Sequence, residues 1–119
     1  MDMTMGEMMQ MQRDLYALHE GEWSPMEPQF GKDSLLYMIE EVGEVIAIIK
    51  KKGGEAILSE NTVRQAFLEE MADVLMYYND VLLRHHVTAD EITDAYCRKH
   101  AHNMGRDYRK QYEEMYHTG

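Results

Sequence analysis

Helix-breaking residues occur in only a few short stretches of this chain, and their distribution constrains the fold more than any other feature. Both prolines, Pro25 and Pro28, lie in one region, and no residue from Gln29 onward forbids a helix outright. The glycine pair at 53–54 and the polar stretch at 85–88 supply two further breaks. Since proline disrupts helices and glycine weakens them, these breaks leave four segments long enough to be helical.

Apolar residues recur at helical spacing along these segments, and no segment shows the sustained alternation of a half-buried strand. The clearest apolar seam, in the second segment, consists of Leu35, Ile39, Val42, Ile46 and Ile49. The face expected to pack in the methionine-rich first segment consists of Met8, Met11, Leu15 and Leu18. We therefore predict an all-α fold with a single domain, 1–119. It would be an antiparallel bundle of four main helices at 1–22, 34–52, 62–84 and 88–116, with Gly105 as a candidate break in the last.

The chain is strongly acidic, with 22 Asp and Glu against 12 Lys and Arg and a formal net charge of −10. Such a surface repels phosphodiester backbones and anionic lipids, so we expect neither nucleic acid polymers nor membranes as partners. No apolar run approaches the roughly 20 residues of a transmembrane helix. The acidic start and the single cysteine, Cys97, favour a cytoplasmic location. A small anionic ligand could bind if a metal ion intervened.

One carboxylate interrupts the apolar pattern of the third helix. The stripe in question consists of Val63, Phe67, Glu70, Val74, Tyr77 and Val81. Glu70 stands where an apolar residue is expected, and Asp73 lies on the same flank. An unpaired carboxylate there is costly unless a cation or hydrogen-bond donors face it, so this position marks a candidate functional site.

The second helix carries a matching pair, Glu41 and Glu44, also three residues apart. If the two pairs face each other, four carboxylates converge, and hard oxygen ligands of this kind select Mg²⁺ or Mn²⁺. Two alternatives remain. The four acids could be solvated residues on exposed helix faces. A di-iron bundle would ordinarily need a Glu-x-x-His on each of two helices, whereas this sequence has that spacing once, near its C-terminal end.

The fourth helix supplies positive charge, with Lys99, Asn103 and Arg106 at spacings of four and three. A helix face with these residues can bind phosphate oxygens. A polyphosphate could contact this face with some of its oxygens and, with the others, bind metal ions held by the acids described above. The alternative is that these basic residues pair with the surplus acids of the bundle.

Two short acidic motifs carry a family resemblance. Residues 40–44 read E-E-x-x-E and residues 69–73 read E-E-x-x-D, and this pattern resembles the MazG-like nucleoside triphosphate pyrophosphohydrolases. Trp23 and the Ser34-Leu35-x-Tyr37 stretch are similar to the lead-in of that family, and Lys99-x-x-x-Asn103-x-x-Arg106 resembles its phosphate-binding stretch. The resemblance covers roughly residues 23–108.

The resemblance implies an all-α pyrophosphatase fold that assembles as a homodimer or homotetramer. The implied reaction converts a nucleoside triphosphate and water to the monophosphate and pyrophosphate. By motif position, the catalytic residues that hold Mg²⁺, or Mn²⁺ in its place, would be Glu41, Glu44, Glu70 and Asp73. Outside these ligands, Glu40 and Glu69 would play supporting or structural roles, and Lys99, Asn103 and Arg106 would bind phosphate. Trp23 and Tyr77 are the candidates for stacking on the base, with packing in the core as their alternative role.

Two other functions remain open at this stage. The chain could be a catalytically silent helical oligomer that binds a nucleotide or a protein partner, an interpretation that the methionine-rich first helix supports. It could also hydrolyse phosphoribosyl-ATP, a reaction that shares the implied fold.

Overall fold

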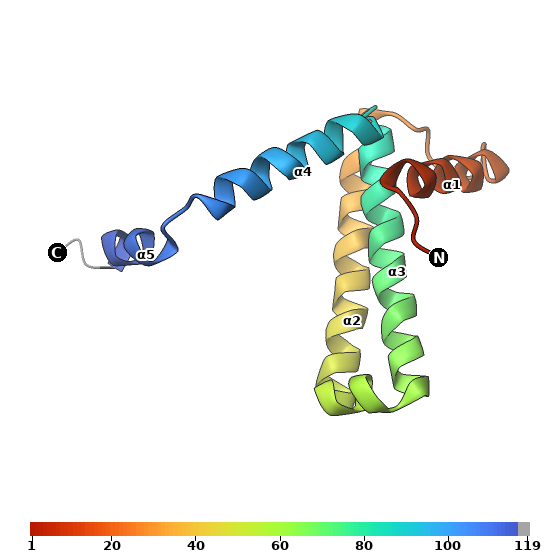
Figure 1. The fold of residues 1–119 in the computed structure, drawn as a ribbon. Helices are drawn as coiled ribbons and strands as arrows, with labels where there is room; N and C mark the ends of the chain where they lie inside the picture. Colours follow the sequence, from red (N-terminus) through yellow and green to blue (C-terminus); the bar gives the residue numbers. More distant parts are fainter. Residues whose placement is uncertain (117–119) are drawn as a thin grey trace. The chain divides into compact units, whose positions relative to one another are not determined.

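The computed structural model describes residues 1–116, apart from the side chain of Tyr108, and it contains five α-helices and one short 3-10 helix, η1 (Figure 1). These are α1 (Met5–Leu18), η1 (Pro28–Phe30), α2 (Gly31–Ser59), α3 (Asn61–Arg84), α4 (Ala89–Met104) and α5 (Tyr108–Tyr116). No β-strand occurs among these residues, so the predicted all-α class is confirmed. The chain divides into two compact units, residues 1–89 and 90–119, which are described separately.

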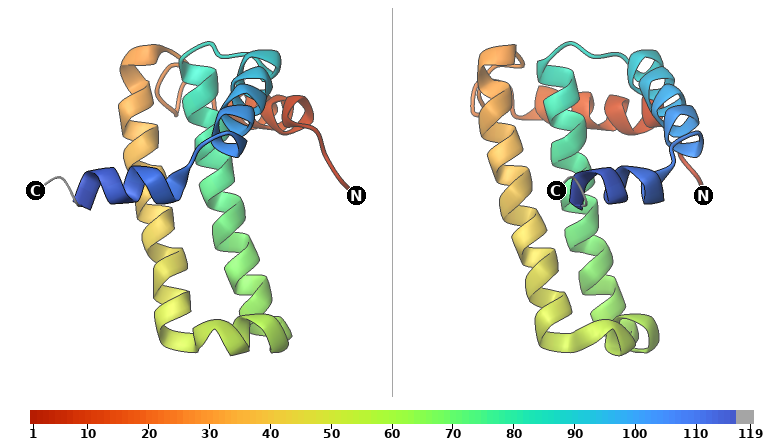
Figure 2. Two further views of the ribbon diagram at one scale, coloured as in Figure 1. Left: turned by 60° about the vertical axis from the view of Figure 1, so that its left-hand side comes forward. Right: turned by 90° about the vertical axis from the view of Figure 1, so that its left-hand side faces the viewer.

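Helices α2 and α3 form the centre of the first unit as a long antiparallel hairpin (Figures 1 and 2). The two helices lie side by side over most of their length, and the chain reverses through a bend at Gly53 and the residues up to Glu60. Their buried apolar residues include Val45 and Ile57 from α2 and Val63 and Leu83 from α3. This hairpin places the two acidic motifs on neighbouring helices.

The backbone of α2 leaves helical geometry at Gly53, where φ is 82° and ψ is 163°. Only glycine adopts such a positive φ readily, because it has no Cβ. The break expected at 53–54 therefore ends the straight part of α2, and residues 54–59 continue as a further short helical stretch before α3 begins.

The face of α2 that is buried differs from the one that the apolar pattern predicts to be buried. The side chains of the predicted seam are 38–58% exposed in Leu35, Ile39, Val42, Ile46 and Ile49. The side of α2 that is buried in the first unit instead carries Ser34 and Val45. Helix α3 thus packs against the side of α2 that carries Glu41, and the apolar seam lies on another side.

Helix α1 packs across α3 (Figure 1). A capping box fixes its start, because the Thr4 and Glu7 side chains each accept a hydrogen bond from the other residue's backbone N–H. Its buried residues are Met9 and Gln12, whereas Leu18, on the face expected to pack, is 76% exposed. The predicted packing face is therefore displaced by about one residue.

The second unit contains two helices where the sequence predicts one over 88–116. Helix α4 ends at Met104, and Gly105 is the first residue past its end. The Asp107 side chain then accepts a hydrogen bond from the backbone N–H of Lys110 at 2.9 Å, which caps the start of α5. None of the described helices is long and apolar enough to cross a membrane.

Candidate metal centre

The hairpin brings three carboxylates from the two acidic motifs to one point. Glu41 lies on α2, and Glu70 and Asp73 lie one helical turn apart on α3. One carboxylate oxygen from each of these residues lies within 4.8 Å of the other two. The three-residue spacing within α3 and the antiparallel pairing of the helices together produce this cluster.

Glu41 is electrostatically strained within the cluster. Its pKa is raised above the ordinary value of 4.5, chiefly by loss of solvent and then by a hydrogen bond with Glu70. The negative charges of Asp73, Glu70 and Glu44 raise it further. A cation at this point would offset the repulsion, and three carboxylates form the hard oxygen donor set that Mg²⁺ and Mn²⁺ prefer.

The fourth predicted ligand, Glu44, lies outside this group of three. Its side chain is exposed, although its charge is close enough to contribute to the raised pKa of Glu41. Glu40 and Glu69, the first acids of each motif, are also exposed. The structure therefore brings together three of the four predicted ligands.

A cavity of about 530 Å³ adjoins the acidic cluster, and Asp73 belongs to its lining. Its aromatic lining residues are Trp23, Tyr37 and Tyr77, so both residues predicted to stack on a base line the same cavity. Tyr77 packs against Tyr37 with ring centroids 6.0 Å apart. Burial, followed by the charges of Glu41 and Asp73, raises the pKa of Tyr77 above its ordinary value.

Trp23 lies in the segment between α1 and α2. Its indole stacks on the ring of His19 with centroids 4.5 Å apart and an interplanar angle of 17°. The His19 ring in turn contacts the Glu22 carboxylate at 3.4 Å. Trp23 is 38% exposed, which leaves part of the indole accessible beside the cavity.

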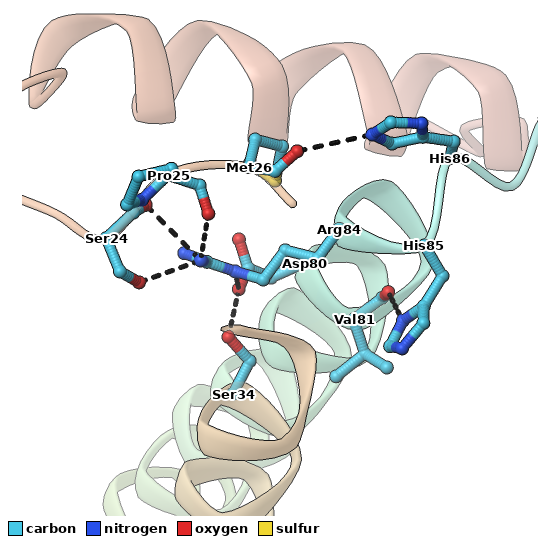
Figure 3. A network of polar contacts seen from close by, with 9 residues as sticks. All are labelled: Ser24, Pro25, Met26, Ser34, Asp80, Val81, Arg84, His85 and His86. Atoms are coloured by element: carbon cyan, nitrogen blue, oxygen red, sulfur yellow. Dashed lines mark hydrogen bonds and ion pairs between the residues drawn. The ribbon is translucent and has the colours of Figure 1, made fainter. Parts of the chain in front are cut away.

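A buried polar network at the same cavity was not found by sequence reasoning. Asp80 and Arg84 are each 4% exposed, and Arg84 Nε donates to Asp80 Oδ2 at 2.7 Å (Figure 3). Ser34 Oγ donates to the same oxygen at 2.5 Å. The four-residue spacing of Asp80 and Arg84 in an apolar stretch is the signal that could have indicated an ion pair here.

A family model of the MazG nucleotide pyrophosphohydrolase domain matches residues 29–103. This region is more than half of the chain and contains both acidic motifs. The chain belongs to the MazG family. Searches of curated proteins and of solved structures gave no significant match.

The MazG match includes Lys99 and Asn103 but not Trp23 or Arg106. Lys99 and Asn103 lie one turn apart near the end of α4, and Arg106 follows the helix, where its Nε donates to Gln111 at 2.9 Å. The three residues therefore do not share one continuous helical face, because α4 ends at Met104. All three belong to the second unit of the chain.

Proposed function

We propose that this MazG protein is a Mg²⁺-dependent nucleoside triphosphate pyrophosphohydrolase, with Mn²⁺ as a possible substitute. It would convert an NTP or dNTP and water to the monophosphate and pyrophosphate, a reaction suited to removing unwanted nucleotides from the pool. The observation that carries this proposal is the meeting of the Glu41, Glu70 and Asp73 carboxylates within 4.8 Å beside an aromatic cavity.

The three clustered carboxylates would hold the metal, and Glu44 would join them after a change of side-chain rotamer. When bound, Mg²⁺ supplies positive charge for the triphosphate and lowers the pKa of a coordinated water. The protein side chains fix where the triphosphate lies relative to that water. One carboxylate of the cluster would accept the proton that the attacking water loses.

The remaining predicted site residues would bind the two ends of the substrate. Trp23 and Tyr77 line the cavity beside Asp73, where a base could stack on an aromatic ring. Lys99, Asn103 and Arg106 would contact phosphate oxygens with two positive charges and an amide N–H.

We also propose that the protein acts as a homodimer or homotetramer. The apolar seam of α2, at Leu35, Ile39, Val42, Ile46 and Ile49, is exposed within the first unit. Large exposed apolar faces on helices usually mark an interface. A second copy that packs its own seam against this face would bury both.

The deciding experiment is a Mg²⁺-dependent pyrophosphate-release assay across ordinary and damaged NTPs and dNTPs, with phosphoribosyl-ATP beside them. Glu70→Gln should abolish release, whereas Glu55→Gln, at an exposed acid after the break in α2, should not alter it. Orthophosphate as the product, or undiminished turnover in Glu70→Gln, would contradict the proposal. Nucleotide binding without hydrolysis of any substrate would favour the catalytically silent alternative.

A further inference from the structure

The end of α3 holds the segment that leads into α2 through one buried side chain. Arg84 Nη1 donates to Ser24 Oγ at 2.8 Å, to the Pro25 carbonyl oxygen at 2.8 Å and to the Ser24 carbonyl oxygen at 3.3 Å (Figure 3). Nη1 has two N–H groups, so two of the three acceptors share one hydrogen, while the separate Nε–H remains bonded to Asp80.

The guanidinium is itself fixed from two helices. Asp80 accepts from Arg84 Nε on α3 and from Ser34 Oγ near the start of α2. The ring of His85, the next residue after Arg84, lies so close to Gly31 that a Cβ atom on residue 31 would overlap the ring. The end of α3, the lead-in segment and the start of α2 are therefore tied together at one place.

The residue that this attachment places beside the cavity is Trp23. It directly precedes Ser24, the residue whose hydroxyl and carbonyl Arg84 binds. The same helix that ends at Arg84 also carries Asp73 and Tyr77, which line the cavity with Trp23. Helix α3 thus carries two of the three clustered carboxylates and, through Arg84, also fixes the residue next to Trp23.

We propose that Arg84, oriented by Asp80, is a positioning residue for the substrate, acting through Trp23. It fixes the indole beside the cavity that Asp73 also lines, where a base can stack while the phosphates reach the acidic cluster. This inference rests on the proposed nucleotide substrate and adds to it a residue that acts through Trp23, because its guanidinium is bonded to Ser24, Pro25 and Asp80. Misplacing Trp23 weakens substrate binding and leaves the acidic cluster unchanged, so the expected effect is on KM more than on kcat.

Trp23 is the only tryptophan in the chain, so its fluorescence reports on this position alone. Arg84→Lys keeps the positive charge but cannot hold three acceptors and Asp80 at once. Ser24→Ala removes one acceptor and leaves the two carbonyl bonds, which gives a milder variant if Arg84→Lys folds poorly. Arg13→Lys, at an exposed arginine on α1 whose Nη1 donates to Gln10, is the matched control.

In Arg84→Lys we expect a shifted Trp23 emission maximum and a KM raised about 5- to 30-fold, since stacking one base on an aromatic ring is worth roughly this factor or more. The kcat should change less than about threefold. Ser24→Ala should shift KM in the same direction by a smaller factor, and Arg13→Lys should change neither quantity. The apparent Kd for Mg²⁺–nucleotide, measured by quenching of Trp23, should follow KM.

A double-mutant cycle with Trp23→Phe separates positioning from general structural support. If Arg84 acts through Trp23, Arg84→Lys should weaken nucleotide binding much less in the Trp23→Phe background than in the wild type, with binding there measured by calorimetry. Equal and additive losses in both backgrounds, or a fall in kcat with unchanged KM, would overturn the inference. So would a wild-type protein whose Trp23 fluorescence responds to no nucleotide. If nucleotide binds and quenches Trp23 but no pyrophosphate is released, the catalytic proposal fails while the positioning inference stands on the binding data.

Discussion

Replacing Glu70 by glutamine should stabilise the metal-free protein while it removes the proposed activity. Glu70 lies within 4.8 Å of both Glu41 and Asp73, so three negative charges share one small volume. At 4.8 Å in water, each pair of like charges costs about 0.9 kcal/mol, and Glu70→Gln removes two pairs. Screening at physiological ionic strength, where the Debye length is about 8 Å, reduces the total to about 1 kcal/mol.

A gain of about 1 kcal/mol corresponds to a rise in Tm of about 4–8 °C for a unit of this size. The assay is thermal unfolding followed by circular dichroism in EDTA at pH 7.5, at low and at physiological salt. The gain should be larger at low salt, because screening is weaker there. Glu55→Gln, an exposed acid outside the cluster, is the control and should leave Tm nearly unchanged.

Adding Mg²⁺ should make the wild type more stable than Glu70→Gln, the reverse of their order in EDTA. The wild type should gain stability with Mg²⁺ concentration, by about 2.7 kcal/mol at 100 times Kd, whereas Glu70→Gln should gain far less. If the Tm of Glu70→Gln in EDTA is equal to or below that of the wild type, the repulsion among the three carboxylates that the structure indicates is absent. An undiminished Mg²⁺ response in the variant would show that Glu70 is not a ligand.

Three further predictions concern Glu41, Gly53 and the exposed seam of α2. The pKa of Glu41 is raised in the folded state, so the stability that its protonation contributes is full below pH 4.5 and is lost as pH rises through the folded pKa. Urea unfolding of the metal-free protein at a series of pH values should show this loss of stability, and the loss should be smaller in Glu41→Gln. Gly53→Ala should lower the free energy of unfolding by about 1 kcal/mol or more, measured by urea titration, since φ is 82° there. Ile46→Glu, on the exposed seam of α2, should reduce the mass measured by light scattering after size exclusion if a second copy covers that seam, while the circular dichroism spectrum stays helical.

The acidic cluster could be predicted because its signal is local in the sequence. Glu70 interrupts an apolar stripe of α3, and Asp73 follows it at the spacing of one turn. Short connections make neighbouring helices antiparallel, so a matching pair on α2 was expected to face this stripe. The spacing could not determine which of the four carboxylates meet, and Glu44 stands outside the group of three in the structure.

The long-range contacts of the buried network around Arg84 could not be predicted, because these partners, unlike Asp80, are remote in sequence. Arg84 binds Ser24, which is 60 residues away, and Asp80 binds Ser34, which is 46 residues away. Serines in loops and at helix starts are common as local caps, so neither position indicated a buried partner. The pairing depends on the lead-in segment folding back over the end of α3, which no local pattern specifies.

The orientation of α2 explains why its packing face was difficult to predict, and it links the fold to the proposed site. A helix with a single packing partner should bury its most apolar side against that partner. In the first unit, however, α2 turns the side with Glu41 toward α3 and leaves the seam around Ile46 exposed. An acidic inner side cannot form a dry core, so the hairpin alone buries few apolar residues in its middle. Covering the outer seam would supply the missing apolar burial, and a cation between the helices would offset the acidic repulsion. Assembly and metal binding would then stabilise opposite sides of the same helix, so each should raise the apparent stability of the hairpin independently.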